Sequence, residues 1–137
     1  MTYPSGDSFS LNVEKIGYCD LEGRPGFKLA LHKSGDRWYL YTAKFWHPGF
    51  SIVEVTDPAN PRFVRFIEGP SNTWTLQVQI ADGLMITSQE KIMEGWGNTP
   101  GEPNGEGFLI WSLDDPEDPK LLGHFKTGGD GTHRNYY

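Results

Sequence analysis

One stretch of this chain occurs twice, and it constrains the fold more than any other feature. The first copy, Gly49–Gly69, reads GFSIVEVTDPANPRFVRFIEG, and the second, Gly107–Thr127, reads GFLIWSLDDPEDPKLLGHFKT. Each copy has strand-forming apolar residues on both sides of an Asp-Pro-x-x-Pro cluster, which is typical of two antiparallel strands joined by a turn. The copies start 58 residues apart and align without a gap, so the sequence predicts a repeated structural unit.

The rest of the chain extends this pair of strands into a unit of four. Two further strands are expected before each copy, at 27–32 and 38–43 for the first and at 74–80 and 84–89 for the second. The predicted fold is therefore all-β, with a four-stranded antiparallel blade at 27–69 and another at 74–127 that carries an insertion at 90–106. Residues 1–12 are a lead-in, 13–23 the outer strand of a closing blade, and 132–137 the inner strand of the next blade.

With the strands of a unit lettered a to d, the chain reads d-abcd-abcd-a, which is the pattern of a β-propeller. The same number of short strands could also form a β-sandwich, but the in-register repeat favours the propeller. Two blades, one outer strand and one inner strand do not close a ring, since propellers have about four to eight blades. We therefore expect an incomplete ring, completed by a second polypeptide or by self-association.

The residues Phe50–Pro58, FSIVEVTDP, also resemble the LVIVD repeat, whose core reads as those letters followed by a small residue and Asp-Pro. Phe108–Pro116 is a weaker copy, in which Trp111 and Ser112 depart from the pattern. The similarity extends from Ile16 to the C-terminus, so the chain resembles the N-terminal portion of an LVIVD-repeat β-propeller. The resemblance implies a fold but no activity, because propellers host unrelated activities.

Composition argues against several classes of function. The net charge of −6 and the lack of any Lys/Arg run give no support to binding of nucleic acid. No apolar run reaches membrane length and the N-terminus has no signal-peptide pattern, so no membrane association is expected. The single cysteine, Cys19, excludes an internal disulfide framework and fits a reducing compartment. We therefore expect a soluble, cytoplasmic protein.

Candidate functional residues gather where the b-to-c and d-to-a connections of the predicted blades emerge, around the mouth of a central channel. A concave mouth with convergent polar groups is the usual place for a ligand site. His133 and His47 are candidate metal ligands or general bases, since neutral imidazole suits both tasks, and Glu90 is a candidate catalytic carboxylate. The candidate ligand-binding residues are Trp46, Asn72, Trp74, Gln77, Gln79, Arg134 and Asn135.

Two classes of function remain open. The first is a binding or assembly module whose channel mouth holds a small molecule or a partner. The second is an enzyme that acts at the mouth, with a divalent metal ion at His133 and His47 as its candidate cofactor. Each candidate also has a structural interpretation, because imidazoles can be hydrogen-bonded channel residues and tryptophans can fill interfaces between blades. His32 and His124, on predicted strands, are interpreted as structural.

Overall fold

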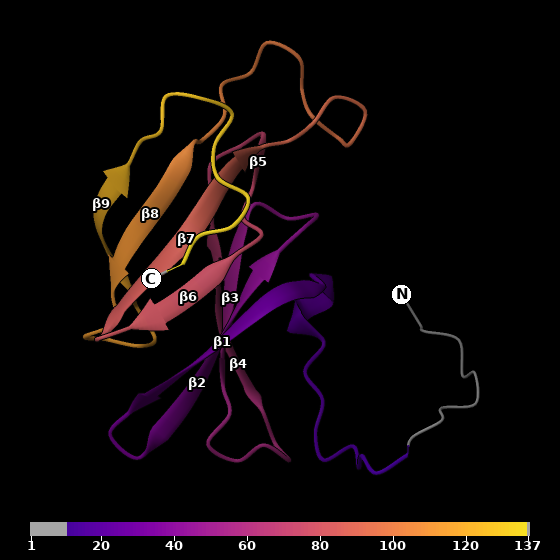
Figure 1. Cartoon of the computed structure of the whole chain (residues 1–137). Coiled ribbons are helices and arrows are strands. Elements are labelled where there is room, and N and C mark those ends of the chain that lie inside the picture. Colours follow the sequence, from indigo (N-terminus) through magenta and orange to yellow (C-terminus); the bar gives the residue numbers. More distant parts are fainter. Residues whose placement is uncertain (1–10, 137) are drawn as a thin grey trace.

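The structure is a computed structural model that describes residues 11–136, and it is all-β (Figure 1). The first antiparallel sheet contains, in this order across it, β1 (Gly26–Ser34), β2 (Arg37–Lys44), β3 (Gly49–Glu54) and β4 (Arg62–Glu68). The second contains β5 (Thr73–Trp74), β6 (Val78–Ala81), β7 (Leu84–Lys91), β8 (Gly107–Ser112) and β9 (Lys120–Phe125). Strands β7, β8 and β9 follow one another across it, and both β5 and β6 pair with β7. The predicted all-β class with antiparallel four-stranded units is confirmed.

Burial explains the sequence pattern of the strands. The central strand β3 is buried along almost its whole length, which is why it reads as a near-continuous apolar run. Strand β1 lies at the edge of its sheet and remains largely exposed. Before β1, η1 (Leu21–Gly23) is a single turn of 3-10 helix, and no helix in residues 11–136 is long and apolar enough to cross a membrane.

The two Asp-Pro turns have the same hydrogen bonds. Asp57 accepts the backbone N–H of Ala59 at 3.0 Å, and Asp115 accepts that of Glu117 at 3.0 Å. An aspartate that bonds its own backbone two residues ahead fixes a tight turn, which explains why this residue type stands at both positions. The side-chain amide of Asn60 and the amide of Ala59 lower the pKa of Asp57.

A β-bulge is also repeated. Pairing of β3 with β4 shifts register between Ile52 and Val53, and pairing of β8 with β9 shifts between Ile110 and Trp111. The two positions correspond in the repeated sequence. A bulge bends a strand locally and increases its twist, so both sheets contain the same local distortion between their last two strands.

The two sheets pack face to face through one apolar core. The first sheet contributes Tyr39, Tyr41, Phe50 and Ile52, and the second contributes Val78, Met85 and Leu113. Phe50 packs edge-on against Trp111, with ring centroids 5.3 Å apart. The inner strands β1 and β6 lie in contact where the sheets meet.

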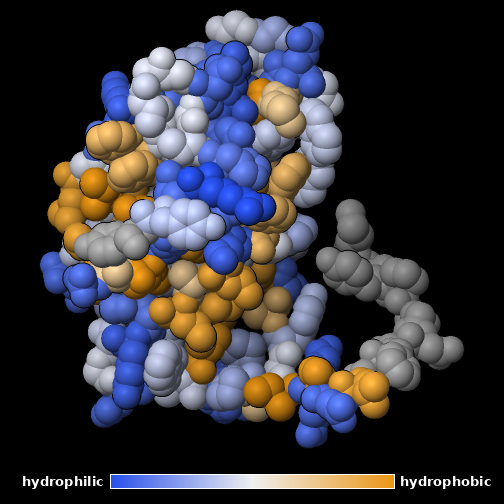
Figure 2. Space-filling model, viewed as in Figure 1, coloured by the Kyte–Doolittle hydropathy of each residue, from blue (hydrophilic) through white to orange (hydrophobic). Residues whose placement is uncertain are grey.

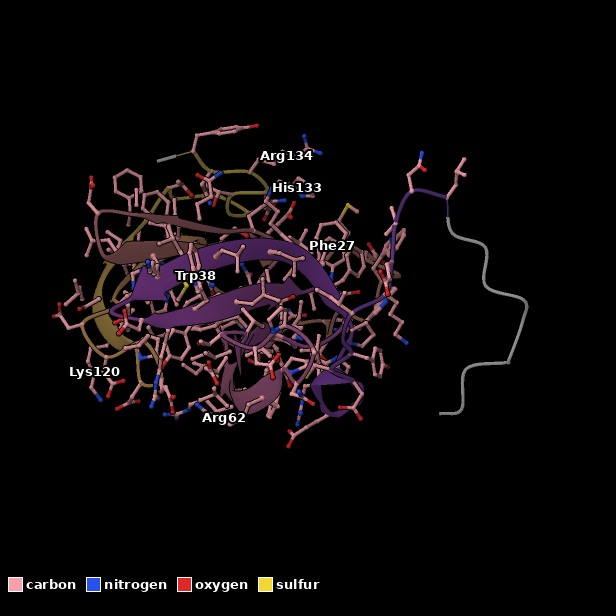
Figure 3. The ribbon with its side chains drawn as sticks, turned by 90° about the horizontal axis from the view of Figure 1, so that it is seen from below. Phe27, Trp38, Arg62, Lys120, His133 and Arg134 are labelled. Atoms are coloured by element: carbon pink, nitrogen blue, oxygen red, sulfur yellow. The ribbon has the colours of Figure 1, made fainter. Side chains whose placement is uncertain are left out.

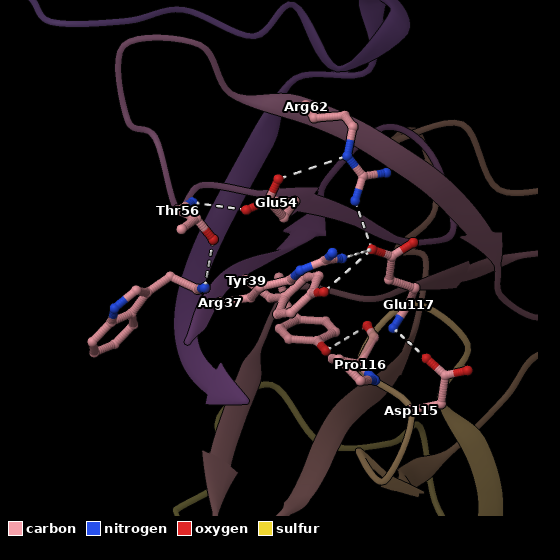
Figure 4. A network of polar contacts seen from close by, with 10 residues as sticks. Arg37, Tyr39, Glu54, Thr56, Arg62, Asp115, Pro116 and Glu117 are labelled. Carbon is pink, nitrogen blue, oxygen red and sulfur yellow. Dashed lines mark hydrogen bonds and ion pairs between the residues drawn. The ribbon is translucent and has the colours of Figure 1, made fainter. Parts of the chain in front are cut away.

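At the outer end of this interface, the second Asp-Pro turn docks on the first sheet (Figure 4). The Tyr41 hydroxyl donates to Pro116 O at 2.7 Å, and the Tyr39 hydroxyl donates to the Glu117 carboxylate at 3.2 Å. Arg62 binds the same carboxylate at 2.6 Å. The turn that defines the repeat is therefore also the contact that fixes how the sheets stack.

Three predicted strands differ in the structure. The outer strand predicted at 13–23 is absent: residues 13–20 form no strand, since no neighbouring strand in the described part of the chain bonds their backbone, and Leu21–Gly23 is the turn η1. Residues 132–136 also form none, apart from a bridge between the preceding Gly131 and Glu90, and Tyr137 lies outside the described residues, as does most of the lead-in. The strand predicted at 74–80 is split, because the carbonyl of Thr75 accepts Lys44 N–H of the other sheet and Gln77 N–H donates to Ser88 Oγ.

Candidate functional site

The connections that were predicted to form the mouth meet at one end of the two sheets. Lys44 N–H donates to Thr75 O at 2.9 Å, which joins the end of β2 to the entry of the second sheet. Lys91 N–H donates to Asp130 O at 2.8 Å, which joins the end of β7 to the segment after β9. In both sheets, the end of the second strand of the unit is therefore hydrogen-bonded to the segment that follows the fourth strand.

Asn72 holds the β7–β8 insertion over this end. Its side-chain amide donates to Glu102 O at 3.2 Å and accepts Thr99 N–H at 3.0 Å. Asn72 itself has a φ of 54°, a left-handed conformation that asparagine tolerates better than most residues. Asn72 is thus a structural clamp, and it also lines a groove of about 810 Å³. The other groove residues are Glu90, Lys91, Ile92, Met93, Glu94, Asn98, Thr99, Pro100, Gly101, Glu102, Pro103, Asn104 and Asp130.

Two of the predicted catalytic residues come together. The Nδ1 atom of His133 lies 2.7 Å from Oε2 of Glu90, although the two residues are 43 positions apart in the sequence. Glu90 is mostly buried at the end of β7, whereas His133 is half exposed in the segment after β9. In the tautomer that carries its proton on Nδ1, the imidazole donates to the carboxylate, and its Nε2 is left to accept a proton.

Four of the predicted ligand-binding residues line one polar hollow of about 280 Å³. Gln77 and Gln79 come from the inner part of the second sheet, and Arg134 and Asn135 from the segment after β9. Lys28 of β1 and Tyr136 complete the wall. Figure 3 shows Arg134 beside His133 on one side of the molecule, with Arg62 on the opposite side. The hollow and the Glu90–His133 pair are therefore joined by consecutive residues.

The two predicted tryptophans separate into different environments. Trp74 is 3% exposed and packs with Leu76 and Ile92 in a small second core, so it is a structural residue. Trp46 is 61% exposed, and its ring is nearly parallel to that of Trp96 from the insertion, with centroids 6.3 Å apart. Trp46 therefore lies at the surface, and it is not one of the residues that line the polar hollow.

The histidines predicted as a metal pair are not joined by a hydrogen bond. Among residues 11–136, no group of three or more His, Cys, Asp or Glu side chains has the arrangement of a metal site. The buried Nδ1 of His47 has no hydrogen-bond partner among the described residues. A divalent metal ion at His47 and His133 stays a prediction. His124 bonds Glu106 O at 2.6 Å through Nε2, which agrees with its structural interpretation.

Sequence reasoning missed Lys28 as part of this region, and it did not anticipate that Lys44 is buried. The sequence predicts Lys28 only as a strand residue. The one available signal is the alternation of side chains along β1, which places Lys28 on the same face of the strand as Ala30. Lys44 has no exposed surface, and its ammonium donates to Arg24 O at 2.7 Å. Burial, followed by the charge of Arg24, lowers the pKa of Lys44 to about 8. No sequence motif marks a lysine for burial at the end of a strand.

Comparison with protein-family models and with curated proteins finds no match for this chain. The resemblance to the LVIVD repeat accordingly stays a prediction from the residues, and function must be argued from the geometry.

The buried ammonium of Lys44 predicts how stability depends on pH. Between pH 8 and about 10, the unfolded chain keeps this proton, because the ordinary lysine pKa is 10.5, whereas the folded chain has released it. Raising the pH over this range therefore favours the folded state. We expect the free energy of unfolding to rise by roughly 1–2 kcal/mol relative to the Lys44→Met variant, since solvent screens part of the effect.

Urea unfolding at several pH values measures this difference, and Lys126→Met, which changes an exposed lysine, is the matched control. Parallel stability curves for the wild type and Lys44→Met would show that Lys44 keeps its proton in the folded protein.

Proposed function

We propose that the two sheets are neighbouring blades of an LVIVD-repeat-like β-propeller, and that the polar hollow beside the inner strands binds a small anionic ligand. The chemistry of the hollow supports this proposal. It combines an ammonium from Lys28, a guanidinium from Arg134 and the carboxamides of Gln77, Gln79 and Asn135. Charged N–H donors backed by amide donors match the oxygen atoms of a carboxylate or a phosphate.

The observation that carries the proposal is the lack of an internal counter-ion. Arg24, Arg37, Arg62, Arg65, Lys91 and Lys120 each have a carboxylate within 4.0 Å. Within residues 11–136, Lys28 and Arg134 have none, and neither do Lys15, Lys33, Lys44 and Lys126. Of these cations, Lys28 and Arg134 are the two that line the same hollow. Two cations that share a hollow without a carboxylate favour an external anion as their partner.

A second candidate function is acid–base catalysis at the edge of this hollow. The Glu90–His133 contact of 2.7 Å is the specific observation in its favour. Glu90 orients the imidazole, and His133 would take a proton from a substrate held by the neighbouring Arg134. This assigns His133 the role of general base and Glu90 that of a positioning residue.

The outer faces of the two sheets support a role in assembly. Ala30 of β1 packs into the core between the sheets, so the neighbouring Leu29 and Leu31 point to the opposite face, where both are more than half exposed. On the far side of the second sheet, Phe125 stacks on Phe108 and is also exposed. Figure 2 shows hydrophobic residues gathered on the β8–β9 side. We propose that further blades, from a second polypeptide or a second copy, cover these two faces.

Residues 13–19 support the same proposal from the other direction. A Cβ atom at Gly17 would lie 2.0 Å from Pro58 O, so this segment lies directly on the first Asp-Pro turn. Arg65 of β4 makes the corresponding contact with the second turn, through Asp118 at 2.8 Å. These two contacts support the proposal that residues 13–19 stand in for an outer strand of a preceding blade. A cytoplasmic location also stays a proposal, which rests on the single cysteine.

The anion proposal predicts binding that depends on both cations. Calorimetric titration with inorganic phosphate and with succinate should show binding to the wild-type chain, weakened about tenfold or more in Arg134→Gln and Lys28→Gln, since each removes a charge-assisted hydrogen bond. Lys126→Gln is the control, because it removes an exposed lysine outside the hollow. Equal binding by Arg134→Gln and Lys126→Gln would refute the site.

The catalytic proposal predicts different effects for two histidines. We expect slow hydrolysis of an anionic aryl ester, reduced at least ~100-fold in His133→Ala with an unchanged melting temperature. His124→Ala should keep the activity and lose about 1 kcal/mol of stability with its hydrogen bond to Glu106 O. Hydrolysis that is absent from the wild type, or equal in wild type and His133→Ala, would exclude this role.

The assembly proposal predicts self-association of the isolated chain. Light scattering of the purified chain should give a mass above the monomer value of 15.5 kDa. The double variant Leu31→Glu, Phe125→Glu should return it to the monomer, because each charge lies on one of the exposed apolar faces. A wild-type chain that stays monomeric at tens of micromolar would exclude a second copy of the chain as the cover of these faces.

A further inference from the structure

The insertion between β7 and β8 brings a second kind of surface to the same end of the sheets. Trp46, in the β2–β3 connection, and Trp96, in the insertion, are 61% and 48% exposed. Their ring planes differ by only 12°. The two indoles come from different sheets, so no local sequence constraint holds them together. We call this pair the tryptophan platform.

Two aromatic rings contact the platform, the partly buried Phe45 and the buried Trp74. Phe45 meets Trp46 edge-on at 4.6 Å and Trp96 edge-on at 6.0 Å between ring centroids. Trp74, which is almost fully buried, meets Trp96 at 82° and 6.2 Å. Edge-to-face contacts of this kind are favourable and directional. The exposed indole faces are therefore held in place before any ligand arrives.

The surface next to the platform is acidic. The turn Met93–Trp96, closed by a hydrogen bond from Trp96 N–H to Met93 O, carries Trp96 and also contributes Met93 and Glu94 to the 810 Å³ groove. Four carboxylates line this groove and only one ammonium, that of Lys91, which is already paired with Asp130. Within the described residues, Glu94 and Glu102 have no cationic partner within 4.0 Å.

A comparison within the protein indicates what such a surface attracts. Trp38, exposed at the opposite turn between β1 and β2, has the Lys33 ammonium 5.6 Å from its ring centroid. No lysine or arginine of residues 11–136 lies over Trp46 or Trp96. An ammonium or guanidinium over an indole face is attracted by the electrons of the ring, and neighbouring carboxylates strengthen that attraction.

We propose that the tryptophan platform and the acidic groove form a binding site for an organic cation, an ammonium or guanidinium head attached to an apolar or extended body. The head lies on the indole faces, and Glu94 and Glu102 balance its charge. Met93, which is exposed at the same turn, contacts the methyl or methylene groups of the ligand. This site is separate from the anion hollow, and neither proposal depends on the other.

The test uses choline as the probe and its uncharged isostere 3,3-dimethylbutan-1-ol as the comparison, with tryptophan fluorescence of the whole chain as the readout. We expect saturable binding of choline, at least about tenfold weaker binding of the alcohol, and weakening of choline binding by added salt. Trp46→Ala and Trp96→Ala should each weaken choline binding about tenfold, and Glu94→Gln or Glu102→Gln should weaken it severalfold.

Trp38→Ala is the matched control, because it removes an exposed tryptophan at the other end of the sheets and should leave choline binding unchanged. Circular dichroism and the melting temperature establish that each variant is folded, and Trp46→Ala tests the site without altering the insertion. A trimethyllysine peptide that binds more tightly than choline would identify a protein side chain as the source of the cation, whereas comparable binding would indicate a free small molecule. Equal binding of choline and the alcohol, or equal effects of Trp96→Ala and Trp38→Ala, would overturn the proposal.

Discussion

The structure depends on the packing of one sheet against the face of the next. Strands such as β3, buried along almost their whole length, cannot be stable in an isolated sheet, because one of their faces would then meet water. Phe50 and Tyr41 remove that face from solvent by packing against the second sheet, and the hydroxyl of Tyr41 ends on a carbonyl of its Asp-Pro turn. Apolar burial supplies the attraction, while the polar contacts of Tyr39, Arg62 and Glu117 fix the relative position of the sheets. Every site at the end of the sheets inherits its geometry from this stacking.

The end of the sheets combines positively and negatively charged groups from segments that are far apart in the sequence. Arg134 and Lys28 present positive charge toward the inner strands, whereas Glu94 and Glu102 present negative charge along the insertion. The hydrogen-bonded pair Glu90–His133 links the two regions. Glu90 lines the acidic groove, and His133 directly precedes Arg134 of the hollow. The hollow and the acidic groove share no lining residue, so the two charges belong to two separate surfaces.

Much of the fold could be predicted because the repeated residues have strong preferences for turn or strand conformations. The Asp-Pro turns, the hairpins and the central strands follow from residue types whose conformational preferences are strong. The sequence predicts that Glu90 and His133 lie on the same face of the molecule, but it does not predict that they are hydrogen-bonded. Sequence periodicity says nothing about contacts between segments 43 residues apart. The strands expected at 13–19 and 132–137 depend on neighbours for their backbone bonds, which is information that a strand's own residues do not hold. The burial of the Lys44 ammonium could not be predicted, because tertiary packing and not residue type decides its environment.

The paired bulges have a consequence for how such a protein changes over time. Because the distortion occurs at the same place in both sheets, each unit contains the same local bend between its last two strands. A duplicated stretch of coding sequence one unit long would thus add a wedge that is already shaped to stack on its neighbour. Gain or loss of whole units leaves the contacts between the remaining sheets unchanged. Selection can then alter the insertion of a single unit, such as residues 92–106, without changing the sheets that carry it.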